Sequence, residues 1–270
     1  MPIGRGDRLG NVHQLGTKAH IARFANPNSD LGLWLSMHAF DMQFLDEKFD
    51  GDAINLDNWT TNAGTGATAF AVPATPILSG AVRAATGTDG TQTNRVVNMY
   101  GPPIYSGDNN CGMQVSFRVS AITSIQFEIG FIDTYNTITT AVPAMPDVDA
   151  PTSWATGLGD AAILALDTEQ TIATMRMMCI GSGSLNSGTG DTFTGVTLPT
   201  ADTWHTVRVQ LAGNTASVYF DGVLRATRAS AIEGGTLVRP FFFVEGVSAT
   251  SRNFDIRRIW AWQDYAVRTA

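Results

Sequence analysis

Hydrophobic and polar residues alternate most regularly in residues 204–224. The residues of the inward parity are Val207, Val209 and Leu211 before a Gly213-Asn214 pair, and Ala216, Val218 and Phe220 after it. Alternation with a period of two on both sides of a Gly-Asn pair predicts two antiparallel strands joined by a tight turn. The Asp221-Gly222 pair that follows predicts a second tight turn.

The same kind of pattern recurs along the chain. Further strand candidates lie at 115–119, 125–131, 162–166, 172–180, 241–244 and 254–262. Phe241–Val244 is continuously apolar, which suits a strand buried on both faces. In the last candidate Phe254, Ile256, Trp260 and Trp262 keep one parity, interrupted by Arg258. Loops rich in Gly, Ser, Thr and Asn, such as 181–191, separate the candidates, and no helix of ten or more residues is predicted. We therefore expect an all-β fold, a two-sheet antiparallel jelly-roll sandwich.

Three parts of the chain are expected. Residues 1–43 are rich in Gly, Asn and Arg and predict an extended N-terminal arm that serves assembly or docking. Within it Leu31–Met37 fits either a short strand or a helical turn, which 28–30 would cap. Residues 44–265 are expected to form the sandwich, and 266–270 a C-terminal tail.

Charge and hydropathy argue against two classes of function, nucleic-acid binding and membrane insertion. The formal net charge is −7, and the 17 Lys and Arg residues are scattered along the sequence. Nucleic-acid binding needs concentrated positive charge, so a nucleic-acid partner is not expected. No run of about 18 apolar residues predicts a membrane span. The first residues lack the apolar core of a signal peptide, so we expect assembly in a cytoplasm. Cys111 and Cys179 are expected to be buried thiols, with a disulfide as the alternative.

Three segments resemble concanavalin A-like lectin/glucanase domains (LamG-like), and the resemblance spans residues 44–265. Phe44–Phe49 with Leu56–Trp59 looks like the opening strand and following Trp of these domains. Trp204-His205 through Tyr219–Gly222 is similar to their late hairpin, and Phe254–Trp262 to their closing strand. The resemblance implies a curved two-sheet jelly roll. Such domains occur in sugar-binding proteins, in glycoside hydrolases and as structural domains of bacteriophage particles, and the fold alone does not choose among them.

The hydrolases of this group carry acids spaced Glu-x-Asp-x-x-Glu on one strand face, and cleavage needs two carboxyls beside the glycosidic bond. The chain has five Glu, at 47, 128, 169, 233 and 245. Glu128 and Asp133 come nearest to the motif, but their opposite parity predicts opposite faces of a strand. Glu128 is expected to face solvent on a half-buried strand. We predict no catalytic residues and no enzyme.

Several other residues are candidates for catalysis, metal binding or sugar binding, and each also has a structural explanation. His205 has Asp202 and Asp221 near it in sequence but no nucleophile motif, so a structural histidine is expected. His13, His20 and His38 lack metal-ligand spacing. The resemblance suggests Ca²⁺ bound by loop oxygens, with turn-forming residues as the alternative. The candidate calcium donors are Asp50, Asp52, Asp57, Asp108, Asn109, Asn110 and Asp202. The candidate sugar-stacking aromatics are Trp59, Tyr100, Tyr105, Tyr135 and Trp154. No cofactor and no metal site is predicted.

The combined prediction is a non-enzymatic virion structural protein. A bacteriophage capsid decoration protein or a tail-associated protein fits a lectin-like sandwich that docks through residues 1–43 onto other virion proteins. A homo-oligomer is expected, with a trimer as the first hypothesis. The alternative is a carbohydrate-binding module for host-surface glycans, and the second alternative is a divergent glycoside hydrolase.

Overall fold

A computed structural model gives the structure of the chain. It describes residues 42–51, 53–73, 80–134, 141–145, 154–169, 174–185, 191–192 and 198–264. The predicted arm up to residue 41, the segment 31–37, the three arm histidines and the tail 266–270 lie outside the described residues.

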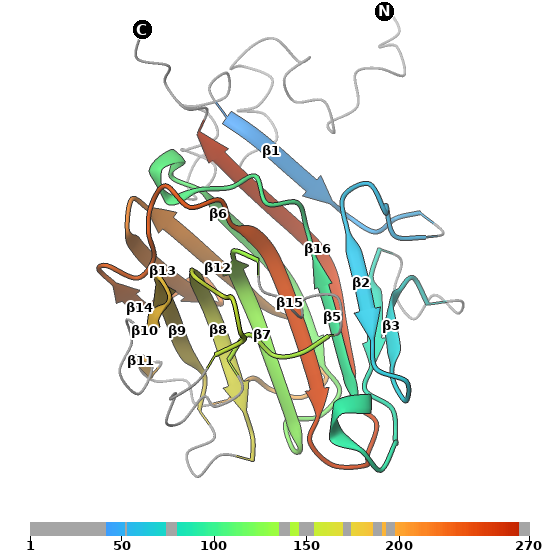
Figure 1. Cartoon of the computed structure of the whole chain (residues 1–270). Helices are drawn as coiled ribbons and strands as arrows, with labels where there is room; N and C mark the ends of the chain where they lie inside the picture. The colour runs from blue at the N-terminus through green and yellow to red at the C-terminus, as the bar shows by residue number, and fades with distance from the viewer. Residues whose placement is uncertain are drawn as a thin grey trace, which may run out of the picture.

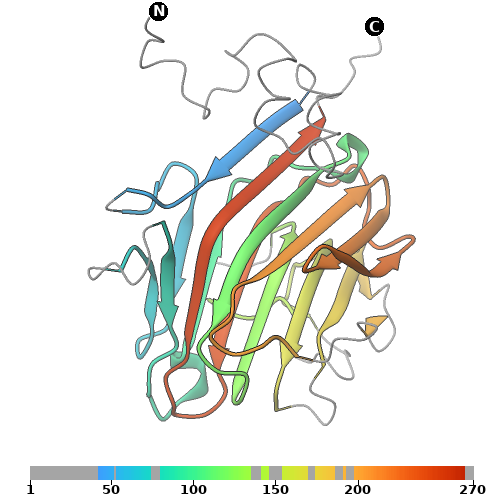
Figure 2. The same cartoon turned by 180° about the vertical axis from the view of Figure 1, so that it is seen from behind.

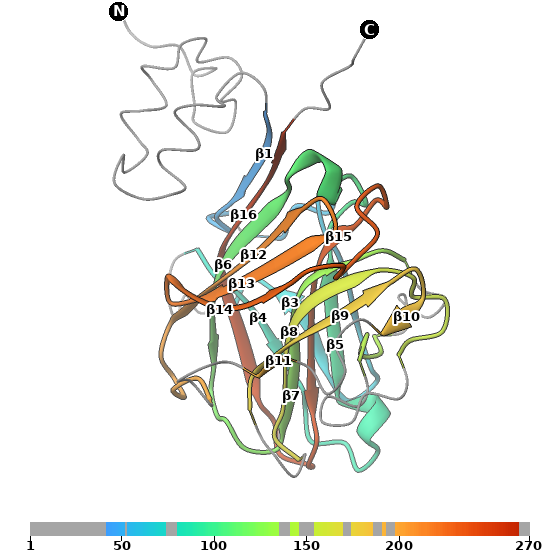
Figure 3. The same ribbon diagram turned by 90° about the vertical axis from the view of Figure 1, so that its left-hand side faces the viewer.

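The described chain folds into two antiparallel sheets that pack face to face (Figure 1). Sheet A has the order β14-β13-β12-β6-β16-β4-β3, with β1 also paired to β16, and sheet B has the order β10-β9-β8-β7-β15-β5-β2, with β11 also paired to β9. Figure 3 shows the two sheets as separate layers. The strands are β1 Met42–Glu47, β2 Thr60–Ala63, β3 Thr68–Ala71, β4 Val82–Ala85, β5 Val96–Tyr100, β6 Gly112–Val119, β7 Ile125–Ile132, β8 Ala161–Asp167, β9 Arg176–Gly181, β10 Ser184–Leu185, β11 Asp191–Thr192, β12 His205–Ala212, β13 Thr215–Phe220, β14 Val223–Arg228, β15 Arg239–Gly246 and β16 Asn253–Asp264.

The all-β prediction is confirmed, and helical structure in the described ranges is limited to two short 3-10 turns, η2 Gln92–Asn94 and η3 Gly107–Asn109. The hairpin is also as predicted. β12 pairs with β13 from Val207↔Phe220 to Ala212↔Thr215, which leaves a two-residue turn at 213–214. Gly213 has φ +56, and Asp221 and Gly222 have φ +49 and +79, the left-handed values that such turns need.

The parity predicted for the last strand is wrong beyond its first half. Phe254 and Ile256 belong to the core between the sheets, but the pairing of β16 with β6 shifts register between Ile256 and Arg258. This β-bulge exchanges the two faces of the strand, so Ile259 and Ala261 point inward. Trp260 and Trp262 therefore lie on the outer face of sheet A, with Trp262 beside Gly112.

A second apolar cluster covers the outer face of sheet B. It joins strand residues such as Ile163, Met178 and Phe241 to residues 141–145 and 154–158, which fold over the sheet. Sheet B is therefore buried on both faces, which explains why β7, β8 and β9 are buried at every position. Cys111 and Cys179 are buried and form no disulfide, as predicted.

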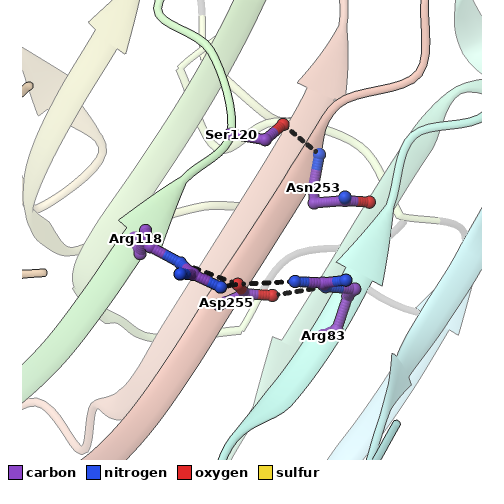
Figure 4. Close-up of polar contacts among 5 residues, drawn as sticks. All are labelled: Arg83, Arg118, Ser120, Asn253 and Asp255. Carbon is purple, nitrogen blue, oxygen red and sulfur yellow. Dashed lines mark hydrogen bonds and ion pairs between the residues drawn. The ribbon is translucent and has the colours of Figure 1, made fainter. Parts of the chain in front are cut away.

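Apart from Trp260 and Trp262, the outer face of sheet A instead carries many polar and charged side chains, and a charged ladder ties three of its strands together (Figure 4). Asp255 of β16 accepts two hydrogen bonds from Arg83 of β4, at 2.7 and 2.9 Å. Arg118 of β6 donates to the same carboxylate from the other side, at 3.0 and 2.5 Å. The Asp255 side chain is only 6% exposed, because the two guanidinium groups cover it.

Replacing Asp255 with Asn is expected to lower the free energy of unfolding by about 2 kcal/mol, because charged hydrogen bonds are lost and two arginines keep like charges with no acid between them. Urea denaturation measures this change. Ser120→Ala is the matched control, since Ser120 Oγ accepts one neutral hydrogen bond from the Asn253 N–H at 2.9 Å on the same pair of strands. A D255N loss no larger than the S120A loss would contradict the expectation.

Candidate functional site

Glu128 lies on the outer face of sheet B, and its predicted solvent-facing position is wrong. Its exposure is 0%. Both carboxyl oxygens accept backbone hydrogen bonds, one from the Ala144 N–H and one from the Met145 N–H, each 2.8 Å long. Burial raises the pKa of Glu128 to about 8, although these two hydrogen bonds oppose the rise. Glu128 thus fastens the 141–145 segment over the sheet.

A cavity of about 450 Å³ opens beside that segment. Its floor includes Gln126 of β7 and Glu245 of β15, which are directly opposite each other in the β15–β7 pairing. Its other lining residues are Gln92, Thr93, Val96, Ala141, Val142 and Pro143. The volume falls within the usual range for small-molecule sites, and hydrogen-bonding side chains and an apolar wall share the lining.

Glu245 gives the cavity its chemical character. Burial raises its pKa to about 7, with a hydrogen bond from Gln92 acting in the opposite direction. At neutral pH the carboxyl is therefore present in both protonation states, and it can donate or accept a hydrogen bond. The Nε2 of nearby Gln126 donates a hydrogen bond to the Met145 carbonyl at 3.0 Å, which fixes the amide at the floor of the cavity.

Arg95 holds the rim of the cavity. This buried side chain donates to the carbonyls of Gly246, Val247 and Asp89, at 2.6, 2.8 and 2.6 Å. It follows directly after the η2 turn, so these bonds tie Gln92 and Thr93 to the end of β15. The two exposed polar residues of the rim are thus placed over Glu245 by a rigid backbone.

Asp133 does not join Glu128 in a catalytic pair. It lies just beyond the end of β7, where its carboxylate accepts the Gly159 N–H at 3.0 and 3.2 Å. Burial raises its pKa to about 6, although the hydrogen bond from the Gly159 N–H opposes the rise. The residue anchors the chain that leads into β8.

His205 has a structural environment. Its Nε2 accepts the Thr200 N–H at 2.9 Å, which leaves the proton on Nδ1 to be donated to Asp221 at 2.8 Å. Its ring packs against Phe117 and Phe220. Asp221 also accepts the Thr206 N–H, so the pair closes the start of the hairpin, and Asp202 makes no part of it.

The candidate sugar-stacking aromatics do not form an exposed shelf. Trp59 and Tyr105 are 1% exposed, and Tyr100 is 9% exposed. Trp154 packs against the second apolar cluster, and Tyr135 lies outside the described residues. Trp59, Tyr100 and Tyr105 are therefore core side chains rather than stacking surfaces.

The candidate calcium donors are not brought together. Asp50, Asp57, Asp108 and Asp202 are exposed in separate loops, and Asn109 follows Asp108 in η3 and is half-buried. Asn110 donates to Asp264, and Asp52 is not described. Within the described part of the chain, no three His, Cys, Asp or Glu side chains gather as a metal site would require. The described candidates therefore form no carboxylate cluster for Ca²⁺. In the same residues, no helix has the length and apolar character to cross a membrane.

Glu245, Gln126 and the η2 residues escaped the sequence prediction. Glu245 ends the apolar run 241–244, and its alignment with Gln126 depends on a strand pairing more than 100 residues apart in sequence. The sequence signal for this site was a single Glu directly after a buried apolar run. The sequence spacing gave no indication that Gln126 of β7 would lie opposite it.

Comparisons with known proteins identify the architecture. No protein-family model and no curated protein sequence matches the chain. Among solved structures, the chain is similar to the Emp46p carbohydrate recognition domain in its potassium-bound form, at 10% identity and a TM-score of 0.54, covering 82% of this chain and 97% of that one.

Two other solved structures show the same likeness. The Bacillus licheniformis beta-glucanase has 13% identity and a TM-score of 0.51, with 82% of this chain and 97% of the glucanase covered. The VIP36 exoplasmic/lumenal domain, in a Ca²⁺/Man-bound form, has 14% identity and a TM-score of 0.50, with 84% and 92% covered. Lectins and glycanases thus share this fold, and identities this low carry the fold alone. The chain has the concanavalin A-like jelly-roll fold of these lectin and glucanase domains.

Proposed function

We propose that this chain is a non-enzymatic carbohydrate-binding domain and that the cavity over Glu245 and Gln126 holds a neutral sugar unit. The observation that carries the proposal is the pairing of these two buried polar side chains at the floor of a cavity of about 450 Å³. Sugar hydroxyls donate and accept hydrogen bonds. A half-protonated carboxyl, an amide and the Thr93 hydroxyl match both roles.

The carboxyls argue for binding rather than hydrolysis. Cleavage of a glycosidic bond needs two carboxyl groups that reach the substrate. Glu128 spends both oxygens on the Ala144 and Met145 N–H groups and is fully buried. Among the described residues that line the cavity, Glu245 is the one acid. The solved lectins of this fold support a sugar ligand, and the solved glucanases keep hydrolysis as the competing function.

Binding of neutral mono- and oligosaccharides, screened on an array and measured by calorimetry, tests the proposal. The double variant Gln92→Ala/Thr93→Ala is expected to weaken binding about tenfold, because at least one rim hydrogen bond is lost. Glu245→Gln is expected to remove the pH dependence of binding near pH 7. Thr91→Ala is the matched control, since Thr91 precedes the same turn but does not line the cavity. If the chain cleaves a polysaccharide and E245Q abolishes the cleavage, the non-enzymatic assignment is overturned. If no glycan on the array binds, the proposal of a sugar ligand is overturned.

We also propose that the domain acts on a bacteriophage particle, as a capsid decoration or tail-associated protein that docks through residues 1–43. The composition of this segment and the charged side chains on the outer face of sheet A support docking. Light scattering of the full chain should give an oligomer, and removal of residues 1–43 should prevent attachment to particles. A monomer that never attaches, with or without the segment, would contradict this.

A further inference from the structure

The outer face of sheet A gathers cations that are scattered in the sequence. Figure 2 shows this sheet from behind, with β16 beside β6 and β1. Five basic side chains and four acidic ones lie along this side of β1, β4, β6 and β16 and the turn after β1. The basic residues are Lys48, Arg83, Arg118, Arg257 and Arg258, and the acidic residues are Asp46, Asp50, Asp255 and Asp264. The face therefore carries an excess of positive charge in a chain whose net charge is −7.

Asp46 holds one pair of these cations. It accepts Nε and Nη2 of Arg258, both at 2.9 Å, and the indole N–H of Trp260 at 2.7 Å. Lys48 lies 3.6 Å from the same carboxylate, and its side chain is 43% exposed. The Arg258 guanidinium also lies over the Trp260 ring, 4.1 Å from its centroid. Arg258 is thus held in place, and its Nη1 takes no part in the two hydrogen bonds to Asp46.

Arg257 is the residue that the β16 bulge adds. The register shift places it beside Arg258 without a partner in the β6 pairing. Its guanidinium lies 5.9 Å from the centroid of the Trp204 ring, and Arg118 lies over the same ring at 5.1 Å. In the described part of the chain, no acid or hydrogen-bond acceptor is paired with the exposed Arg257 side chain. Bulges often redirect a side chain in this way beside functional sites.

These cations converge on a shallow pocket of about 250 Å³, lined by Lys48, Asp50, Gly80, Arg257 and Arg258. Gly80 forms one wall with bare backbone. It has φ +80, and a Cβ there would come within 2.9 Å of the Lys48 carbonyl oxygen. Lys48, Arg257 and Arg258 carry three positive charges in this lining. Asp50 in the lining and Asp46, which pairs with Lys48 and Arg258, carry two negative charges, so one net positive charge remains to complement an anion. The volume of the pocket is smaller than that of the cavity over Glu245, which suits a single charged group.

We propose that this pocket binds the carboxylate of an acidic sugar, such as a uronate. Guanidinium groups match a planar carboxylate through paired hydrogen bonds, and among the described residues Arg257 is the lining arginine without an acidic partner. The rings of Trp204 and Trp260 lie against the guanidinium groups of Arg257 and Arg258 and support them. The saccharide identity rests on the proposed carbohydrate-binding function. The anion site itself rests on the pocket and lies on the other sheet from the Glu245 cavity.

Calorimetry with an oligogalacturonate, at two salt concentrations, tests the proposal. Arg257→Ala is expected to weaken oligogalacturonate binding about tenfold, and a neutral galactose oligosaccharide should not bind this pocket. Arg208→Ala is the matched control, since Arg208 lies over the Tyr219 ring of the same face but outside the pocket. The thermal midpoint of R257A should equal that of the parent chain, because Arg257 is exposed.

Two results would overturn the acidic-sugar site. One is equal oligogalacturonate affinity for R257A, R208A and the parent chain. The other is binding of inorganic sulfate or a polyglutamate peptide as tight as oligogalacturonate binding and equally dependent on Arg257, which would make the pocket a general anion or acidic-protein site. The two sites fail separately. If Q92A/T93A weakens neutral-sugar binding and R257A does not, the Glu245 cavity is supported even when the acidic-sugar site is overturned. If oligogalacturonate binding depends on Arg257, the acidic-sugar site is supported even when the Glu245 cavity binds no sugar.

Discussion

Replacing Glu128 with Ala is expected to lower the free energy of unfolding by about 3–5 kcal/mol. The variant leaves the Ala144 and Met145 N–H groups buried without their acceptors, at a cost of about 1–3 kcal/mol each. The emptied volume lies beneath residues that pack on the outer face of sheet B, which adds the cost of a cavity. Urea denaturation followed by tryptophan fluorescence measures the change, and the two-state slope shows whether the native state stays compact.

Glu128→Gln separates the hydrogen bonds from the charge. The Gln carbonyl can still accept one of the two N–H groups, but its amide N–H₂ faces the other, so the expected loss near pH 5.5 is smaller, about 1–2 kcal/mol. Sugar binding in the Glu245 cavity should weaken in E128A, because the 141–143 wall loses its anchor. An E128A variant within about 1 kcal/mol of the parent chain would show that Glu128 does not fasten this segment.

The sequence predicted the sandwich because its strands carry local signals. The β12–β13 hairpin combines strict alternation with two turns that need positive φ, and each of these features is contained within about 20 residues. The inward positions predicted for the closing strand were wrong for an equally local reason. A bulge at Arg257 shifts the inward positions by one residue, and Trp260 and Trp262 are apolar enough to pass for core residues on a continuous strand.

The candidate site was beyond the reach of sequence periodicity. Alternation along β7 marks Glu128 as outward, and it is outward relative to the core between the sheets. Whether an outward residue meets solvent depends on what covers that face. Here the cover comes from residues 141–145 and 154–158, whose packing on sheet B leaves no periodic signal in β7. The pairing of Glu245 with Gln126 and the gathering of arginines on sheet A depend in the same way on contacts between distant strands.

The stability of the protein is expected to fall by several kcal/mol as the pH rises from 5 to 8.5. Burial raises the pKa of Glu128 from 4.5 to about 8 and that of Glu245 from 4.5 to about 7. Between the unfolded and folded pKa values the folded chain keeps protons that the unfolded chain has lost. The stabilisation is therefore complete below about pH 4.5 and is lost as the pH rises through the folded values. Each carboxyl contributes a slope of at most about 1.4 kcal/mol per pH unit.

Urea denaturation at pH 5.5, 7.0 and 8.5 measures this dependence, with single and double variants to assign it. Glu128→Gln should remove most of the slope well above pH 7, where Glu245 is already largely ionised. Glu245→Gln should reduce the slope below pH 7 without abolishing it, because Glu128 and, up to about pH 6, Asp133 contribute there as well. Glu233→Gln, at an exposed turn residue, is the matched control and should leave the slope unchanged. A slope that survives in the E128Q/E245Q double variant would assign the pH dependence to other groups and contradict the prediction. Stability of the parent chain that stays constant from pH 5.5 to 8.5 would mean that both carboxyls are ionised in the folded protein. In that case the Glu245 cavity would hold a fixed negative charge at neutral pH, and its preference would move from neutral sugars to cationic ligands.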